Sequence, residues 1–197
     1  ELADADFGLI SRAGSFAFEL KNGGLDIQLS SAFTVTGGQV FVQFSGLTSP
    51  VTEPTTIEVG PVSYTFDNAI DASTVAFAVV DLRADVGGVF QLSGDIGFKK
   101  SGIAPEILAV GNDVTVRLEV DSSVYVELAR ADFGMIAGSG KFVFELKNGA
   151  LDIALGPIAN VTADQVFVQF SNPSPISTVE AGTTIGVGPV GYTFDDD

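Results

Sequence analysis

The residues that could do chemistry in this chain are almost all carboxylates. Its 197 residues include 25 Asp and Glu but no His and no Cys. The usual general bases, thiol nucleophiles and zinc ligands are therefore missing. Two carboxylates could still hydrolyse a glycosidic bond, but Glu19 and Glu145 fall at predicted outward positions of strands, where solvation explains them. We therefore expect a protein that is not an enzyme.

Calcium is the one candidate cofactor, because oxygen ligands gather at two places in the sequence. Asp67, Asn68 and Asp71 lie in the segment FDNAIDAS, and Asp195 and Asp196 follow the last phenylalanine. Loops that combine carboxylate and carbonyl oxygens can hold Ca²⁺. These five residues are the candidate metal ligands. The alternative is that both places are acidic turns exposed to water, since no EF-hand pattern is present.

The charge and hydropathy of the chain exclude several classes of partner. The formal net charge is −16, which repels nucleic acid and anionic membrane surfaces. No run approaches the roughly 18 apolar residues that a spanning helix needs, so we expect a soluble chain without membrane insertion. The acidity is explained by solubility, by adaptation to salt or by bound cations. Because no initiating methionine or signal peptide is seen, we interpret the sequence as a piece of a longer chain.

The sequence repeats itself at long range. ELADADFGLI at Glu1 returns as ELARADFGMI at Glu127, and TTIEVGPVSYTF returns as TTIGVGPVGYTF near the end. We divide the chain into block A (residues 1–66), block B (67–126) and a second copy of block A (127–197). The full period is about 126–128 residues, and such self-similarity is typical of repeat architectures.

The repeated segment FELKNGGLDIQL has the alternation of a β-hairpin. Phe16, Phe18 and Leu20 alternate with smaller or polar residues, and the alternation resumes after Asn22-Gly23. Asn-Gly tolerates the positive φ angles of a tight turn. The pattern predicts two short antiparallel strands joined at Asn22-Gly23, with the phenylalanines on a buried face.

The same period-two alternation continues through the chain, and it predicts an all-β fold. TIEVGPVSYTF reads as two short strands broken at Gly60-Pro61, since proline cannot donate to a ladder. No window has convincing helical periodicity. We expect either tandem β-sandwich modules or an elongated antiparallel β-stack, rich in hairpins and without substantial helix. Phenylalanines are assigned to the core, which leaves Tyr64, Tyr125 and Tyr192 as candidates for a surface platform.

Four segments together resemble repeats of very large secreted bacterial surface proteins of the type I secreted, adhesin-like kind. They are VFQLSGDIGF, VGNDVTVRLEV, FELKNGALDIAL and TTIGVGPVGYTF. The resemblance covers essentially the whole chain, although the glycine-aspartate nonapeptides of such proteins are not found in it. It implies an extracellular or cell-surface repeat array, exported unfolded, that builds a long arm or fibre.

Two hypotheses for function follow. The first is a structural extracellular repeat module that forms a spacer arm or filament, whose partners are neighbouring repeats of the same chain or identical chains end to end. The second is an adhesin module that presents the variable loops 45–56 and 171–183 to a sugar or another host-surface ligand. The loops differ between the copies while the strands hardly change, which fits either hypothesis.

Overall fold

The computed structural model describes residues 1–66, 69–102, 106–138, 140–172 and 179–195. These residues form fourteen strands and no helix, so the predicted all-β, antiparallel class is confirmed. No described segment is a helix able to cross a membrane. The strands are β1 (Leu2–Ala3), β2 (Asp6–Arg12), β3 (Ser15–Ser30), β4 (Phe33–Ser45), β5 (Thr55–Val59), β6 (Val62–Phe66), β7 (Val75–Val86), β8 (Phe90–Lys100), β9 (Ile107–Asp121), β10 (Val124–Gly138), β11 (Lys141–Leu155), β12 (Asn160–Asn172), β13 (Thr184–Val187) and β14 (Val190–Thr193).

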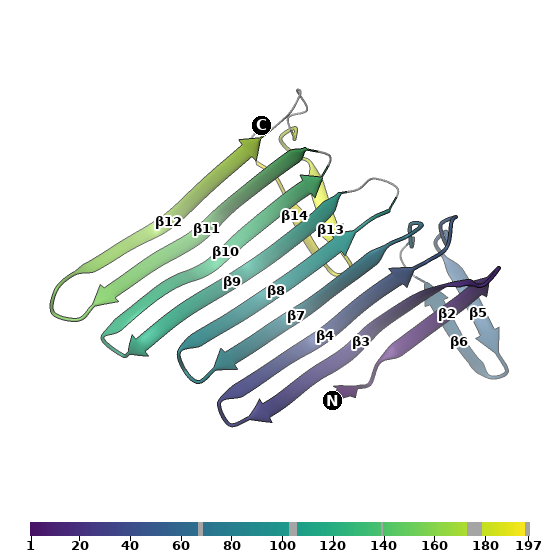
Figure 1. Ribbon diagram of the computed structural model, residues 1–197, viewed down its shortest axis with the longest axis horizontal. Helices are drawn as coiled ribbons and strands as arrows, with labels where there is room; N and C mark the ends of the chain where they lie inside the picture. The colour runs from purple at the N-terminus through teal and green to yellow at the C-terminus, as the bar shows by residue number, and fades with distance from the viewer. Residues whose placement is uncertain (67–68, 103–105, 139, 173–178, 196–197) are drawn as a thin grey trace.

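One long antiparallel sheet carries the whole architecture (Figure 1). Its strand order is β1-β3-β4-β7-β8-β9-β10-β11-β12, and β2 also pairs with β3. Neighbours in sequence are mostly neighbours in space, as expected when strands are joined by short turns. Two separate hairpins, β5–β6 and β13–β14, pack on one face of this sheet near one end of its strands. We call this face the hairpin face and the opposite one the outer face.

The predicted turn at Asn22-Gly23 is wrong, because β3 runs straight through it as a single strand of 16 residues. Asn22 does have a positive φ angle of 63°. However, one such residue makes a bulge in a strand and does not reverse the chain. The side chain of Asn22 donates to Asp6 Oδ2 at 2.8 Å and accepts from Gln39 Nε2 at 2.9 Å. These bonds tie the bulge to the two neighbouring strands.

Similar bulges cross the sheet from strand to strand, and we call them the bulge row. Their defining residues have positive φ angles in β3, β7, β9, β10 and β11. Asp81 N donates to Asp95 Oδ1 at 2.8 Å and Asp113 N donates to Asp132 Oδ1 at 2.9 Å, so carboxylates satisfy the amides that the bulges free from the ladder. The members of the row are Asn22, Asp81, Asp113, Arg130 and Asn148.

The bulge row changes the strand alternation, so that apolar side chains lie on the outer face along the full strand length. Leu128 and Leu146 belong to different sides of the row, yet both lie within 4 Å of the position that a Cβ of Gly149 would occupy. Directly paired residues share a face. One outer row on the hairpin side of the bulges contains Phe7, Leu20, Val42, Phe77, Phe98, Ala109, Met135, Phe144 and Phe170.

The hairpin face has two different halves, one on each side of the bulge row. The half under the hairpins presents small apolar residues such as Ala76, Ala78 and Val110, which are buried. The other half, which we call the open half, is polar. One row of paired residues there contains Thr34, Asp85, Gln91, Arg117, Glu127, Asp152 and Thr162.

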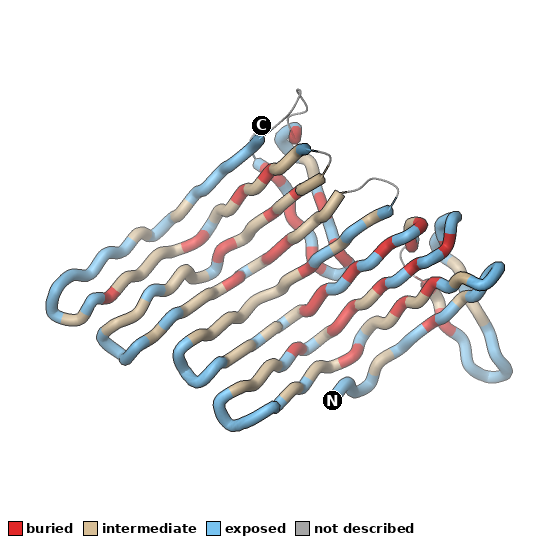
Figure 2. Tube along the Cα trace, viewed as in Figure 1, coloured by how far each residue is buried: buried red, intermediate tan, exposed pale blue. Residues whose placement is uncertain are grey.

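The expectation that the phenylalanines fill a core is wrong for the outer face. Phe16 is 44% exposed, whereas its neighbours Ala17 and Glu19 are fully buried beneath the first hairpin. Figure 2 shows buried residues concentrated in the half of the sheet that carries the hairpins. Alternation correctly placed Phe16 and Phe18 together on one face, but the layer that covers the sheet there lies on the other face.

The bulge at Asn148 gives a test of this architecture. Asn148 has a φ angle of 61°, and its side-chain Nδ2 donates to Asp132 Oδ2 at 2.7 Å. We expect Asn148→Val to lower the free energy of unfolding by about 2 to 3 kcal/mol, because a β-branched residue is strained at positive φ. Asn148→Gly, which tolerates this φ, should lose only about 1 kcal/mol with the side-chain bond. Urea unfolding measures both, and equal losses would contradict the assigned geometry.

Candidate functional site

The most specific arrangement in the chain is the attachment of each short hairpin to the sheet. The break between β5 and β6 lies at Gly60-Pro61, as the sequence predicted, and β13–β14 turns at the equivalent Gly-Pro pair. Paired threonine hydroxyls near the base of each hairpin lie 3.0 Å apart for Thr56 and Thr65, and 2.9 Å apart for Thr184 and Thr193. Both copies of the repeat therefore build the same local element.

A buried carboxylate holds the second hairpin to the sheet. Glu145 of β11 is fully buried, so its predicted outward position is wrong. Its Oε1 accepts from the Tyr192 hydroxyl at 2.6 Å and from the Asp195 amide at 3.2 Å. Its Oε2 has no hydrogen-bond partner among the described residues. A buried carboxylate is costly without partners, so these two bonds favour this seating of the hairpin.

The first copy repeats this attachment with a complete set of partners. Glu19 of β3 is also fully buried, and its Oε1 accepts from the Tyr64 hydroxyl at 2.9 Å. Its Oε2 accepts from Gln43 Nε2 at 2.6 Å. We call each pair, Glu19 with Tyr64 and Glu145 with Tyr192, a Glu–Tyr latch. Tyr64 and Tyr192 are therefore buried anchors, and their prediction as surface platforms is wrong.

A lysine two residues further along the same strand reinforces each latch. Lys147 Nζ donates to the Thr193 carbonyl at 2.8 Å and lies 4.8 Å from the centre of the Tyr192 ring. It also pairs with Asp195 at 2.5 Å. Lys21 contacts the Thr65 carbonyl and the Tyr64 ring in the same way. The cation–π contact and the charged hydrogen bond both hold the hairpin base to the sheet.

The second latch changes the acidity of its tyrosine. Burial, followed by the hydrogen bond to the Glu145 carboxylate, raises the pKa of Tyr192 well above its usual range. Both causes favour the neutral phenol, because a phenolate would be desolvated and would face a like charge. Tyr192 therefore remains a hydrogen-bond donor wherever the fold is intact.

The candidate calcium ligands do not form one described cluster. Asp67, Asn68 and Asp196 lie outside the described residues. Asp71 pairs with Lys99 at 2.9 Å and Asp195 pairs with Lys147. No group of three or more acidic, histidine or cysteine side chains within the described ranges is placed to hold a metal ion. Calcium binding at the junctions stays a prediction.

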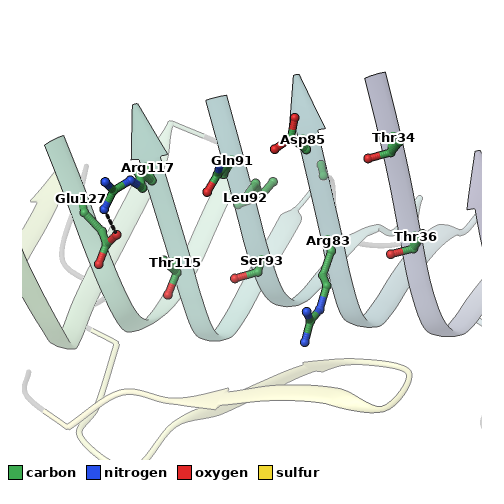
Figure 3. Close-up of a pocket in the computed structure, with 11 residues that line it drawn as sticks. Thr34, Thr36, Arg83, Asp85, Gln91, Leu92, Ser93, Thr115, Arg117 and Glu127 are labelled. Atoms are coloured by element: carbon green, nitrogen blue, oxygen red, sulfur yellow. Dashed lines mark hydrogen bonds and ion pairs between the residues drawn. The ribbon is translucent and has the colours of Figure 1, made fainter. Parts of the chain in front are cut away.

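A polar depression of about 570 Å³ lies on the open half (Figure 3). Arg117 there donates to Glu119 at 2.7 Å and to Glu127 at 2.9 Å, and these bonds raise its pKa. The guanidinium lies 3.9 Å from the centre of the Tyr125 ring. A hydrogen bond to Asp152 raises the pKa of Tyr125. The Arg117 and Glu127 charges in this depression are thus paired with each other within the chain.

The described residues of the variable loops do not line this depression. In the loop 45–56, Leu47 and Val51 are buried in the core beneath the first hairpin. Residues 173–178 of the loop 171–183 lie outside the described residues. The predicted ligand-presenting role of these loops therefore remains a prediction, and part of the first loop serves packing.

Sequence reasoning missed the latches, although a usable signal was present. Glu19, Gln43 and Tyr64 each have an identical counterpart in the second copy, at Glu145, Gln169 and Tyr192. Register places Glu19 opposite Gln43 and Glu145 opposite Gln169. A polar residue kept identical between copies at strand positions is a candidate for a buried partner as much as for a solvated one.

Comparison with known proteins returns no relatives. A scan of protein-family models finds no match, and neither the curated proteins nor the solved structures contain a match to the chain.

The latch can be tested by removing one hydroxyl. We expect Tyr192→Phe to lower the free energy of unfolding by about 2 kcal/mol, because a hydrogen bond to a buried carboxylate is lost. Tyr125→Phe is the matched control, since it removes a bond of 2.8 Å to Asp152 at a partly exposed site and should lower the free energy of unfolding clearly less than Tyr192→Phe does. Chemical denaturation would measure both, and an equal effect of the two substitutions would argue against the latch.

The same tyrosine predicts a dependence on alkaline pH. The folded pKa of Tyr192 is raised, so its contribution to stability is present below the unfolded value of about 10 and is lost as pH rises above it. The difference in unfolding free energy between the natural chain and Tyr192→Phe should therefore hold below about pH 10 and shrink as the pH rises further. A constant difference would contradict a buried neutral phenol.

Proposed function

We propose that the chain is a structural repeat module whose sheet continues from one period to the next, forming a spacer arm or filament of a large extracellular surface protein. The resemblance to secreted bacterial surface repeats supports the setting, and the continuous sheet supports the mechanical role. No step of this proposal requires a reaction or a bound small molecule.

One observation carries the proposal: both copies of block A occupy equivalent places in a single sheet. β4 and β12, the same strand of the two copies, are six strand positions apart. Each copy fixes its own hairpin with the same Glu–Tyr latch. Since strands in a sheet lie roughly 4.8 Å apart, one period would add about 29 Å along the stacking direction.

The distribution of charge is compatible with such an array. The net charge of −16 opposes unregulated association of sheets that have exposed apolar side chains. The strands of the open half carry paired polar residues on the hairpin face, where neither of the two described hairpins covers them. A long single sheet would therefore have one hydrated strip running beside its row of hairpins.

The proposal predicts that length grows in proportion to the number of periods. We would place residues 1–126 once more before Glu1 and measure both chains by small-angle X-ray scattering. The molecule should lengthen by about 29 Å along the stacking direction at constant cross-section, and the maximum dimension, which is a diagonal of the sheet, should increase by somewhat less. A chain that becomes thicker or more globular without becoming longer would contradict the spacer function.

A further inference from the structure

The two hairpins have the same turn sequence but very different surroundings at the tip. Val187 and Val190 flank the second turn and are each 1% exposed, whereas their counterparts Val59 and Val62 are 77% and 69% exposed. Both tips read Val-Gly-Pro-Val. The difference therefore comes from what lies beneath each tip and not from the hairpins themselves.

The second hairpin reaches backward across block B. Its strands contact β10, β9, β8 and β7, and its tip ends over β4. Val187 packs so closely on β8 that a side chain added at Gly97 would come within 2.8 Å of it. Gly188 lies against the ring of Phe41, which is only 4% exposed. Small residues in block B and one phenylalanine thus form a seat for the tip.

The first hairpin is seated only at its base. Tyr64 and Phe66 are buried with Ala17 of β3 and Ile10 of β2. Its tip projects past β2 at the amino-terminal edge of the sheet (Figure 1). A Cβ added at Gly60 would meet no atom within 4 Å. The apolar tip therefore extends beyond the strands that hold its base.

We infer that the exposed tip of β5–β6 docks on a second copy of the β7–β8–β9 face, placed beside β2. This inference rests on the proposed tandem arrangement and adds to it a direction, in which each hairpin closes over the block B that precedes its own block A. The seat offered to Val59 and Val62 is the one that Val187 and Val190 already occupy, formed by Gly97, Val110 and their neighbours.

The free edge of the sheet identifies the occupant. β2 repeats the second half of β10, and that half pairs with β9. A β9-like strand is thus the expected neighbour of β2. Direct contact with the β12 edge of another molecule fits less well, because the tip would then reach β10 and β9, which β13–β14 already covers.

The opposite end of the sheet presents the complementary feature. Phe167 of β12 is the counterpart of Phe41 and is 53% exposed. In the interior of the chain, Phe41 is covered by the turn glycine of a hairpin that lies in the following block A. The exposed tip of β5–β6 and the exposed Phe167 are thus counterparts of the two partners, Gly188 and Phe41, that contact each other inside the chain.

Cysteine labelling would test the docking, because the chain contains no natural cysteine. We would compare Val59→Cys and Val187→Cys in the present chain and in a chain that carries a second copy of residues 67–126 before Glu1. In the present chain Val59→Cys should react rapidly and Val187→Cys slowly. In the extended chain the labelling of Val59→Cys should slow at least about tenfold, as for a site that must open locally to react. Unchanged labelling would overturn the inference.

A matched control blocks the seat in the added copy alone. Replacing the glycine equivalent to Gly97 by leucine there should restore rapid labelling of Val59→Cys and leave Val187→Cys slow. Circular dichroism reports whether the added block folds, and an added block that gains no β structure would also count against the inference, since β2 should template it. If scattering shows that the molecule lengthens while Val59→Cys still reacts rapidly, the docking is overturned and the spacer function stands. Absence of growth would overturn the spacer function.

Discussion

The bulge row is the constraint on which the arrangement of the sheet depends. A strand of 15 or 16 residues with uninterrupted alternation would keep the same residues on the same face from end to end. Here the alternation changes at residues such as Asn22 and Asn148, whose positive φ angles are held by side-chain bonds across the sheet. The change keeps the outer face apolar along each strand. It also lets the hairpin face be small and apolar in one half and polar in the other.

The Glu–Tyr latches depend on that division of the hairpin face. Glu19 and Glu145 lie in the half that the hairpins cover, and each is buried against a tyrosine from its own hairpin. A buried carboxylate contributes little net stability, because desolvation opposes the bonds it makes. Its effect is to disfavour every other seating of the hairpin, in which the charge would be buried without partners. The latch therefore fixes the position of an element that is otherwise held by apolar packing and by the neighbouring lysine.

Part of this fold could be predicted from the sequence, because alternation and turn chemistry are local. The strands, the absence of helix in the described residues and the turn at Gly60-Pro61 followed from such patterns. Asn22-Gly23 misled for a physical reason: the residues indicate a positive φ angle, but a bulge and a hairpin turn both need one. The neighbours that distinguish them, such as Gln39 and Asp6, are distant in sequence.

Burial was harder to predict than strand position, because it too depends on neighbours that are distant in sequence. Alternation shows which residues share a face and leaves open which face is covered. Phe16 and Phe18 are large apolar residues of the kind that usually fills a core, yet the covering hairpin packs on Ala17 and Glu19. That hairpin begins about 40 residues later, at Thr55. The contact between them is therefore non-local in sequence, and a local pattern does not reveal it. Only the identity of Glu19, Gln43 and Tyr64 between the copies indicated the site.

The reach of β13–β14 across several strands has a mechanical consequence. Tension along the stacking direction would load the backbone ladders in series, so that a single sheet would separate at its weakest strand pair. A hairpin latched at Glu145 and seated over β8 and β4 bridges the ladders between those points. To open any of them, the force must also slide or lift the hairpin. The covered stretch would thus yield as one unit, and compliance would concentrate at strand pairs that no hairpin spans.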